Sequence, residues 1–129
     1  MAWKRITILD TDAHAGNGSH PESYRLVFEE IVEPMIREFK PQVIIRNGGS
    51  DPHFADILTQ LGLTIDGFRM IGGKVRELAE VCDGREIDLI ASGYNIEVLP
   101  YAWLALISGL ADWKIKVALN NFSSRRTLF

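Results

Sequence analysis

Short apolar runs alternate along the chain with longer segments in which apolar residues recur at helical spacing. The first run is rich in β-branched residues and apolar on both faces, which is typical of a strand buried in a parallel sheet. Similar short runs follow each of the first two helix-like segments. The pattern predicts strands at Ile6–Asp10, Gln42–Arg46 and Ile87–Ala91, and helices from about Glu22 to Phe39, from Thr64 to Gly84 and at Leu99–Leu110.

Capping and breaking residues support the first helix. Ser19 and Glu22 have the spacing of a capping box, and Pro21 suits a first helical turn. Pro34 should bend the helix, because it lacks the N–H that the preceding turn needs. The predicted apolar face consists of residues at helical spacing: Tyr24, Phe28, Ile31, Met35 and Phe39.

The later elements are predicted in the same way. Thr64 is the expected N-cap of the second helix, and Gly84 is its expected end. Leu99–Leu110 is apolar on all sides, which predicts a fully buried helix. Lys114–Leu119 reads as a last strand, and the polar tail from Asn120 is expected to be loose.

This order of strands and helices predicts an α/β fold with a parallel sheet and right-handed crossovers. Each predicted strand is followed by a polar turn that contains glycine. Ligands of such sheets bind beyond the carboxyl ends of the strands. The three turns should therefore lie side by side. They contain Asp12 and His14 in the first, Asp51 in the second and Tyr94 in the third.

Composition narrows the class of protein. The chain has 129 residues, of which 47% are hydrophobic and 24% charged, as in one ordinary globular domain. The formal net charge of -3 argues against a nucleic-acid surface, and the apolar runs are too short to span a membrane. No signal peptide is apparent, and the single cysteine, Cys82, fits a reducing compartment. We therefore expect a cytoplasmic protein.

The first turn carries the chemistry. Alternate residues of an extended segment point the same way, so Asp10, Asp12 and His14 can share one side. An imidazole and carboxylate oxygens suit Zn²⁺, and a third ligand from Asp51 would leave one position open for water, as in catalytic zinc sites. The alternative is structural: Asp10 can satisfy backbone donors at a strand end, and Asp51 or Tyr94 can be a turn or core residue.

Three segments resemble one known family. ILDTDAHAGNG resembles the D-x-D-x-H-x-G-[DN]-G signature of the histone deacetylase superfamily, which includes acetoin-utilization proteins and acetylpolyamine amidohydrolases. The stretch FKPQVIIRNGGSDPHFADILTQLGLTIDGF and the turn SGYNIEVLPYAWLAL resemble its later motifs in the right order. The resemblance runs from about Ile6 to Leu110. It implies a three-layer arginase/deacetylase-like sheet, with residues 1–119 as the C-terminal part of the domain and 120–129 as a tail.

The resemblance also implies roles at matching positions. Asp12, His14 and Asp51 would bind zinc, and Tyr94 would stabilise charge on the substrate carbonyl oxygen. Asp10 would help to hold a structural K⁺ ion. Gly48 and Gly93 would line the acyl channel. The implied reaction is zinc-assisted hydrolysis of an acyl amide, on an acetylated small amine or an acetyl-lysine protein.

The sequence departs from the family in several respects. Ser92 replaces the first glycine of the family's Gly-Gly-Tyr turn, and the strand and proline-glycine-rich loop that normally follow Gly18 are missing. The family's general base is a pair of adjacent histidines that precedes the segment matched at Ile6, and the three histidines here, His14, His20 and His53, include no such pair. His53 is the nearest candidate for a substitute, although we expect it on the loop rim. We expect only part of the domain, whose uncovered sheet would promote self-association. A monodisperse monomer in light scattering would contradict that expectation.

Two other functions compete with the zinc hydrolase. ILDTD also resembles the nucleophile motif of haloacid-dehalogenase phosphatases, with Asp10 as nucleophile, Asp12 as acid/base, and Asp51 and Asp56 for Mg²⁺. That interpretation lacks the expected Ser/Thr and Lys motifs and gives His14 no role. A non-catalytic module is the second alternative: it would bind zinc and catalyse no hydrolysis.

Overall fold

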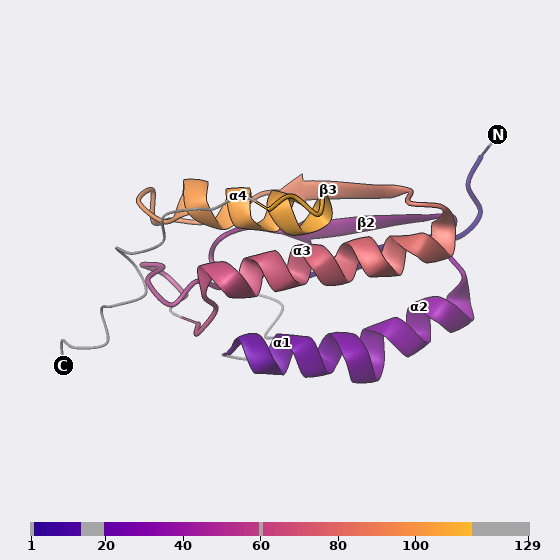
Figure 1. The fold of residues 1–129 in the computed structure, drawn as a ribbon, viewed down its shortest axis with the longest axis horizontal. Coiled ribbons are helices and arrows are strands. Elements are labelled where there is room, and N and C mark those ends of the chain that lie inside the picture. The colour runs from indigo at the N-terminus through magenta and orange to yellow at the C-terminus, as the bar shows by residue number, and fades with distance from the viewer. Residues whose placement is uncertain (1, 14–19, 60, 115–129) are drawn as a thin grey trace.

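The computed structural model describes residues 2–13, 20–59 and 61–114. The elements follow the predicted alternation (Figure 1). They are β1 (Ile6–Asp10), α1 (Pro21–Val27), a π-helical turn η2 (Phe28–Val32), α2 (Glu33–Phe39), β2 (Val43–Gly48), α3 (Ile65–Ala79), a 3₁₀ turn η3 (Glu80–Cys82), β3 (Glu86–Ile90) and α4 (Leu99–Leu110).

The three strands form one parallel sheet in the order β1-β2-β3. Ile8 lies opposite Ile45, which lies opposite Ile87 on the other side. All carboxyl ends therefore lie at one edge, where Asp10 is beside Asn47 and Gly48 is beside Ile90. The predicted α/β class and parallel sheet are confirmed, with strand bounds that shift by no more than two residues.

The first helix is continuous but not regular. Its N-cap is His20, without a side-chain hydrogen bond, so the predicted capping box at Ser19 is wrong; Ser19 itself lies outside the described residues. Pro34 has no N–H to donate to the previous turn, and its ring would crowd a carbonyl there. The π turn Phe28–Val32 precedes it, and the Glu33 N–H reaches back to the Phe28 carbonyl. The irregularity predicted at Pro34 is thus a widened turn.

The second helix begins as its sequence predicts. The Gly67 N–H donates to Thr64 Oγ1 at 3.2 Å, which satisfies one of the free donors of the first turn. The chain leaves the helix through η3, then Asp83 and Gly84, both with positive φ. Its inner face supplies much of the core, with Phe68, Ile71, Val75 and Leu78 buried. Figure 1 shows α3 between the α1–α2 helix and α4.

One prediction about the C-terminal region is wrong, and another stays a prediction because it concerns residues outside those described. Helix α4 packs against α3 through Ala102, Ala105 and Leu106, but its opposite face is partly exposed: Tyr101, Leu104 and Ile107 are 37–39% accessible. The prediction of a fully buried helix is therefore wrong, because an all-round apolar sequence does not say how many sides are covered. No strand is assigned at Lys114, and the rest of the predicted strand and tail lie outside the described residues.

One face of the sheet is covered and the other is open. Ile44 on the covered face is fully buried among core residues of α1, η2 and α3. On the opposite face Ile8 is 71% exposed and Leu89 is 49% exposed. This is the uncovered apolar surface that the sequence led us to expect; self-association through it stays a prediction. None of the helices in the described ranges is long and apolar enough to cross a membrane.

Candidate metal and active site

The exit turns of all three strands meet at the carboxyl edge of the sheet. The Ser92 hydroxyl, just beyond β3, lies 2.6 Å from Asp12 Oδ2 and 3.0 Å from Asp51 Oδ1. Asp12 follows β1 and Asp51 follows β2, so one hydroxyl contacts carboxylates from both neighbouring turns. The predicted convergence of the two acids is therefore present in the structure.

Burial and charge both act on Asp51. Its side chain is fully buried, and burial is the main reason that its pKa is raised above the usual carboxyl range. The Ser92 hydrogen bond opposes that rise, whereas the nearby charge of Asp12 adds to it. Two carboxylates that repel each other in a buried site form a favourable environment for a cation, because its positive charge offsets the repulsion. The donor set therefore fits a divalent metal.

The structure does not test the third predicted ligand. His14 lies outside the described residues, so its place beside Asp12 and Asp51 stays a prediction. Within residues 2–13, 20–59 and 61–114, no group of three or more His, Cys, Asp or Glu side chains is arranged to hold a metal ion. The described part of the chain thus contributes two carboxylates, and a complete site requires at least one more donor.

Asp10 stabilises the start of the first turn. Its Oδ1 accepts the Asp12 N–H at 2.9 Å, and its Oδ2 lies 3.4 Å from Asn47 Nδ2 on the neighbouring strand. These contacts fit the structural role considered for Asp10, since they fix the backbone immediately before the candidate ligand. The predicted K⁺ ion near Asp10 stays a prediction.

Tyr94 lies in the same cluster of turns and is 42% exposed. Its backbone N–H donates to Asp56 Oδ2 at 2.9 Å, while Asp56 Oδ1 accepts the N–H groups of Leu58 and Thr59. Asp56 is buried and its carboxylate is occupied by backbone donors. This arrangement counts against Asp56 as a Mg²⁺ ligand of a phosphatase. Sequence reasoning missed its positioning role, although Asp56 is part of the motif that resembled the deacetylases.

The two glycines predicted to line a channel are required by close contacts. A Cβ at Gly48 would lie 2.5 Å from Thr11 Oγ1 and 2.7 Å from Arg46 Nη1. At Gly93, where φ is +124°, a Cβ would lie 1.9 Å from Ser50 Oγ. Glycine is therefore needed so that the turns can pack together. Whether either residue also lines an acyl channel stays a prediction.

A buried ion pair lies beneath the site, and the sequence analysis missed it. Arg46 of β2 is 1% exposed, and its guanidinium donates to both Asp88 carboxylate oxygens at 2.7 and 2.8 Å. The same guanidinium donates to Thr11 Oγ1, immediately before Asp12. The available signal was a basic residue, Arg46, and an acidic residue, Asp88, each next to apolar residues in neighbouring strands. The parallel register places Arg46 directly opposite Asp88.

Tyr24 is a second residue whose position the sequence did not reveal. It was expected only as part of an apolar helix face, which is partly wrong: Tyr24 is 3% and Phe28 is 2% exposed, whereas Ile31, Met35 and Phe39 are 49–64% exposed. Its pKa is raised to about 12, first by burial and then by the charges of Asp51 and Asp12. Tyr24 also lines a cavity between α1 and the end of β1, together with Leu9, Asp10 and Thr11. It thus forms part of the wall behind the carboxylates and stays protonated at neutral pH.

His53 is in the core, so its predicted place on the loop rim is wrong. It is fully buried, its Nδ1 accepts the Ala55 N–H at 3.1 Å, and its ring stacks on Phe68 with centroids 6.2 Å apart. Burial lowers its pKa to about 4, so the ring is neutral at neutral pH. A ring enclosed in this way is a packing residue and is poorly placed to exchange protons with substrate.

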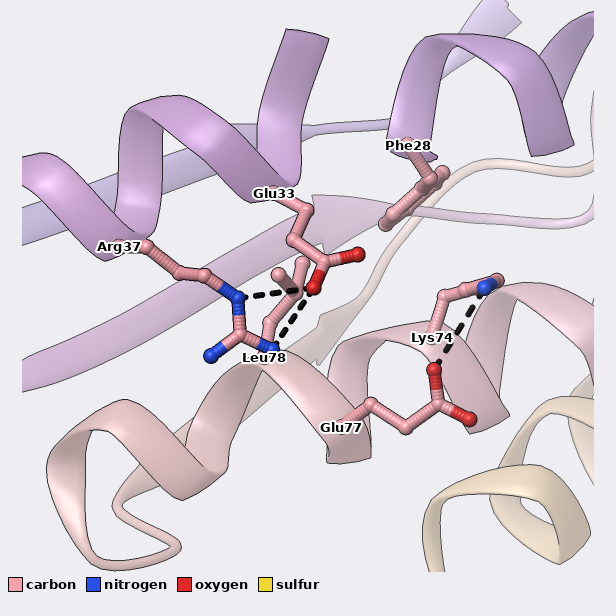
Figure 2. A pocket seen from close by; sticks show the side chains of 6 residues that line it. All are labelled: Phe28, Glu33, Arg37, Lys74, Glu77 and Leu78. Atoms are coloured by element: carbon pink, nitrogen blue, oxygen red, sulfur yellow. Dashed lines mark hydrogen bonds and ion pairs between the residues drawn. The ribbon is translucent and has the colours of Figure 1, made fainter. Parts of the chain in front are cut away.

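A separate groove lies between α2 and α3, away from the carboxylates. Figure 2 shows Glu33 beside Arg37 on α2 and Glu77 beside Lys74 on α3, one pair on each side of the groove. The Arg37–Glu33 and Lys74–Glu77 pairs measure 2.7 and 3.5 Å, and Lys74 also reaches Glu29 at 3.0 Å. These charges are largely paired with one another, which makes the groove a helix–helix contact with a polar rim rather than a candidate site.

Glu86 gives the fold a pH dependence that can be tested. Burial, and then the charge of Asp88, raise its pKa from 4.5 to about 7. The folded state therefore binds more protons than the unfolded state, and stability decreases as the pH rises from about 4.5 to about 7. Replacing Glu86 by glutamine should remove this loss, so the variant should gain in urea midpoint over the wild type at pH 8 and not at pH 4. Glu38→Gln, an exposed carboxylate on α2, is the control. Parallel stability curves for wild type and Glu86→Gln would contradict the assignment.

Comparison with known proteins identifies the family. The histone deacetylase domain model matches residues 20–110, which include Asp51, Ser92 and Tyr94 but not Asp12 or His14. A probable deacetylase of Archaeoglobus fulgidus is 39% identical over 100 residues, covering 76% of this chain and 28% of the relative. The acetoin utilization protein AcuC of Staphylococcus xylosus is 37% identical over 92 residues, covering 67% of this chain and 24% of the relative.

Solved structures show the same fold. The HD domain of HDA15 superposes with a TM-score of 0.77 at 18% identity, over 91% of this chain and 47% of that one. An acetylpolyamine aminohydrolase of Burkholderia pseudomallei superposes with a TM-score of 0.71 at 17% identity, over 86% of this chain and 46% of that one. The chain thus spans about a quarter of the length of the curated relatives it matches. The family model matches residues 20–110, which is most of this chain. The chain therefore belongs to the histone deacetylase domain family.

Proposed function

We propose that this chain provides the zinc-binding and oxyanion-stabilising part of a deacetylase-type amidohydrolase site. The observation that supports it is the contact of one hydroxyl with Asp12 and Asp51, from adjacent turns, in a member of this family. Asp12, Asp51 and His14 would hold the ion. Bound there, Zn²⁺ would supply the Lewis acidity needed for attack of water on an acyl amide.

The residues of this chain would do the remaining work of binding and orientation. Asp10 accepts the Asp12 N–H, and Arg46 donates to the hydroxyl of Thr11, the residue before Asp12. Asp56 fixes the turn that presents Tyr94. Tyr94 would donate its hydroxyl to the substrate carbonyl oxygen as negative charge develops. The proposed substrates are acetylated amines, either small polyamines or acetyl-lysine side chains.

The proposal assigns no general base to the described residues. Two carboxylate ligands cancel the formal charge of the ion and so acidify water less than neutral ligands would, which makes a base necessary. His53 is enclosed in the core and does not fill that role. The base would come from residues outside those that the structure describes.

Metal analysis together with an activity assay tests the function. We expect one Zn²⁺ per chain after dialysis, measured by elemental analysis. Hydrolysis of an acetyl-lysine peptide or an acetylpolyamine would establish the catalytic role. Stoichiometric zinc without turnover of either substrate would favour the non-catalytic metal-binding module, and absence of bound zinc would refute the site itself.

Replacing Tyr94 by phenylalanine separates catalysis from metal binding. In any preparation that hydrolyses an acetyl-lysine peptide, we expect kcat to fall about 100-fold or more, since one oxyanion donor is lost. Zinc content should not change, because Tyr94 is not a proposed ligand. Tyr101→Phe, on the partly exposed face of α4, should leave both measurements unchanged. Full activity of Tyr94→Phe would rule out the oxyanion role.

A further inference from the structure

Ser92 occupies a backbone position that is normally suited to glycine. Its φ is +37°, in the left-handed region that disfavours residues with a Cβ atom. A strained conformation that is retained by a serine is a reason to ask what the hydroxyl does.

The hydroxyl lies between the two proposed metal ligands. Its distances of 2.6 Å to Asp12 Oδ2 and 3.0 Å to Asp51 Oδ1 are both in the hydrogen-bonding range. A serine hydroxyl has a single proton, so at any moment it donates to one carboxylate while the other lies within reach. It is therefore placed to offset the repulsion between two acids that come from different turns.

The surrounding backbone fixes where this hydroxyl can be. The Ser50 N–H donates to the Ser92 carbonyl at 3.1 Å, and the Ala91 N–H donates to the Gly48 carbonyl at 3.1 Å. A Cβ on Gly49 would lie 2.1 Å from Ser92 O and 2.3 Å from Ser92 Oγ, so the two turns are in close contact. The serine is thus held against the very segment that carries Asp51.

We propose that Ser92 is a positioning residue for the metal site: its hydroxyl holds the Asp12 and Asp51 carboxylates in the orientation that binds the ion. This rests on the proposed function of that site. With a cation present, the hydroxyl donates to one of the carboxylate oxygens and fixes its direction. Groups that hydrogen-bond to metal ligands in this way typically contribute about 10- to 100-fold to metal affinity.

A merely structural serine predicts the opposite behaviour. If Ser92 only stabilised the turn, its replacement by glycine would lower stability or leave it unchanged, with no specific effect on metal. Under our proposal, Ser92→Gly removes both the left-handed strain and the hydrogen bond between the two acids, so the urea stability of the metal-free protein changes little. At the same time its Zn²⁺ affinity falls. Stability and affinity thus move independently, which separates the two explanations.

The experiment measures Zn²⁺ affinity by competition with a chelating dye, and the visible absorption of the Co²⁺-substituted protein. We expect Ser92→Gly and Ser92→Ala each to bind Zn²⁺ about 10-fold more weakly and to shift the Co²⁺ bands. Ser108→Ala is the matched control, since that buried hydroxyl donates to the Ala105 carbonyl within α4.

The possible outcomes distinguish this inference from the proposed function. Unchanged affinity and unchanged Co²⁺ bands in both Ser92→Gly and Ser92→Ala, with a wild type that binds zinc, would overturn the role of Ser92 alone. Tighter binding in those variants would overturn it too, because the hydroxyl would then compete with the ion. A wild-type chain that binds neither Zn²⁺ nor Co²⁺ would overturn the metal site, and the positioning role with it.

Discussion

Replacing Asp51 by asparagine should reduce zinc affinity by about two orders of magnitude or more, because only Asp12 and His14 of the proposed ligand set remain. The fold should survive. The amide has the shape of the carboxyl group, and Ser92 can still donate to its carbonyl oxygen from 3.0 Å away. Equilibrium dialysis with Zn²⁺, alongside urea unfolding of the metal-free protein, measures both effects.

The control for this variant is an acid near the site that is no proposed ligand. Glu97 is exposed just beyond the Tyr94 turn, and Glu97→Gln should bind zinc as the wild type does. Asp12→Asn should resemble Asp51→Asn. Near-normal zinc affinity in both aspartate variants would refute the metal site as a whole, whatever the behaviour of His14.

Loss of the buried guanidinium should have the largest effect on stability. Arg46→Met would leave the Asp88 carboxylate, whose side chain is 10% exposed, without its partner. Breaking a buried ion pair by removing one member typically destabilises a protein by about 3–5 kcal/mol. Urea unfolding at pH 7 measures the loss, and the variant is also expected to bind zinc less well because the Thr11 hydroxyl loses its donor.

Two further variants test whether burial of the ion pair is the cause of the expected loss of stability in Arg46→Met. Arg37→Met removes a pair of similar length on the surface of α2, where the side chains are 55% and 35% exposed, and should change stability by no more than about 1 kcal/mol. The double variant Arg46→Met/Asp88→Leu removes both buried charges and should recover much of the loss. A loss of less than about 1 kcal/mol for Arg46→Met alone would contradict the argument.

Arg46 also connects the fold to the site. The residue lies within β2, reaches Asp88 on β3 on one side and Thr11 at the end of β1 on the other. The Thr11 N–H in turn donates to the Asn47 carbonyl at 2.9 Å. Through these contacts a single side chain links β2 to β3 and to the residue that follows β1. We therefore expect the orientation of Asp12 to depend on this ion pair.

The sequence by itself determined the elements whose signals are local. Strand β1 has the bounds predicted for it, Ile6–Asp10, and Thr64 caps α3 by accepting a hydrogen bond from the Gly67 N–H three residues away. The alternation of strands and helices was enough to predict a parallel sheet, and three short motifs were enough to indicate the family. These features depend on neighbours within a few residues, so a single chain without coordinates reveals them.

The tertiary structure decided which residues far apart in the sequence contact one another. The hydrogen bond from Ser92 to Asp12 joins residues 80 positions apart, and the pairing of Arg46 with Asp88 spans 42. His53 is buried with its ring against Phe68 of α3, and α4 packs on α3 while Tyr101, Leu104 and Ile107 on its other face are partly exposed. None of these depends on local spacing. They follow from strand register and from which surfaces pack together, which no short stretch of sequence contains.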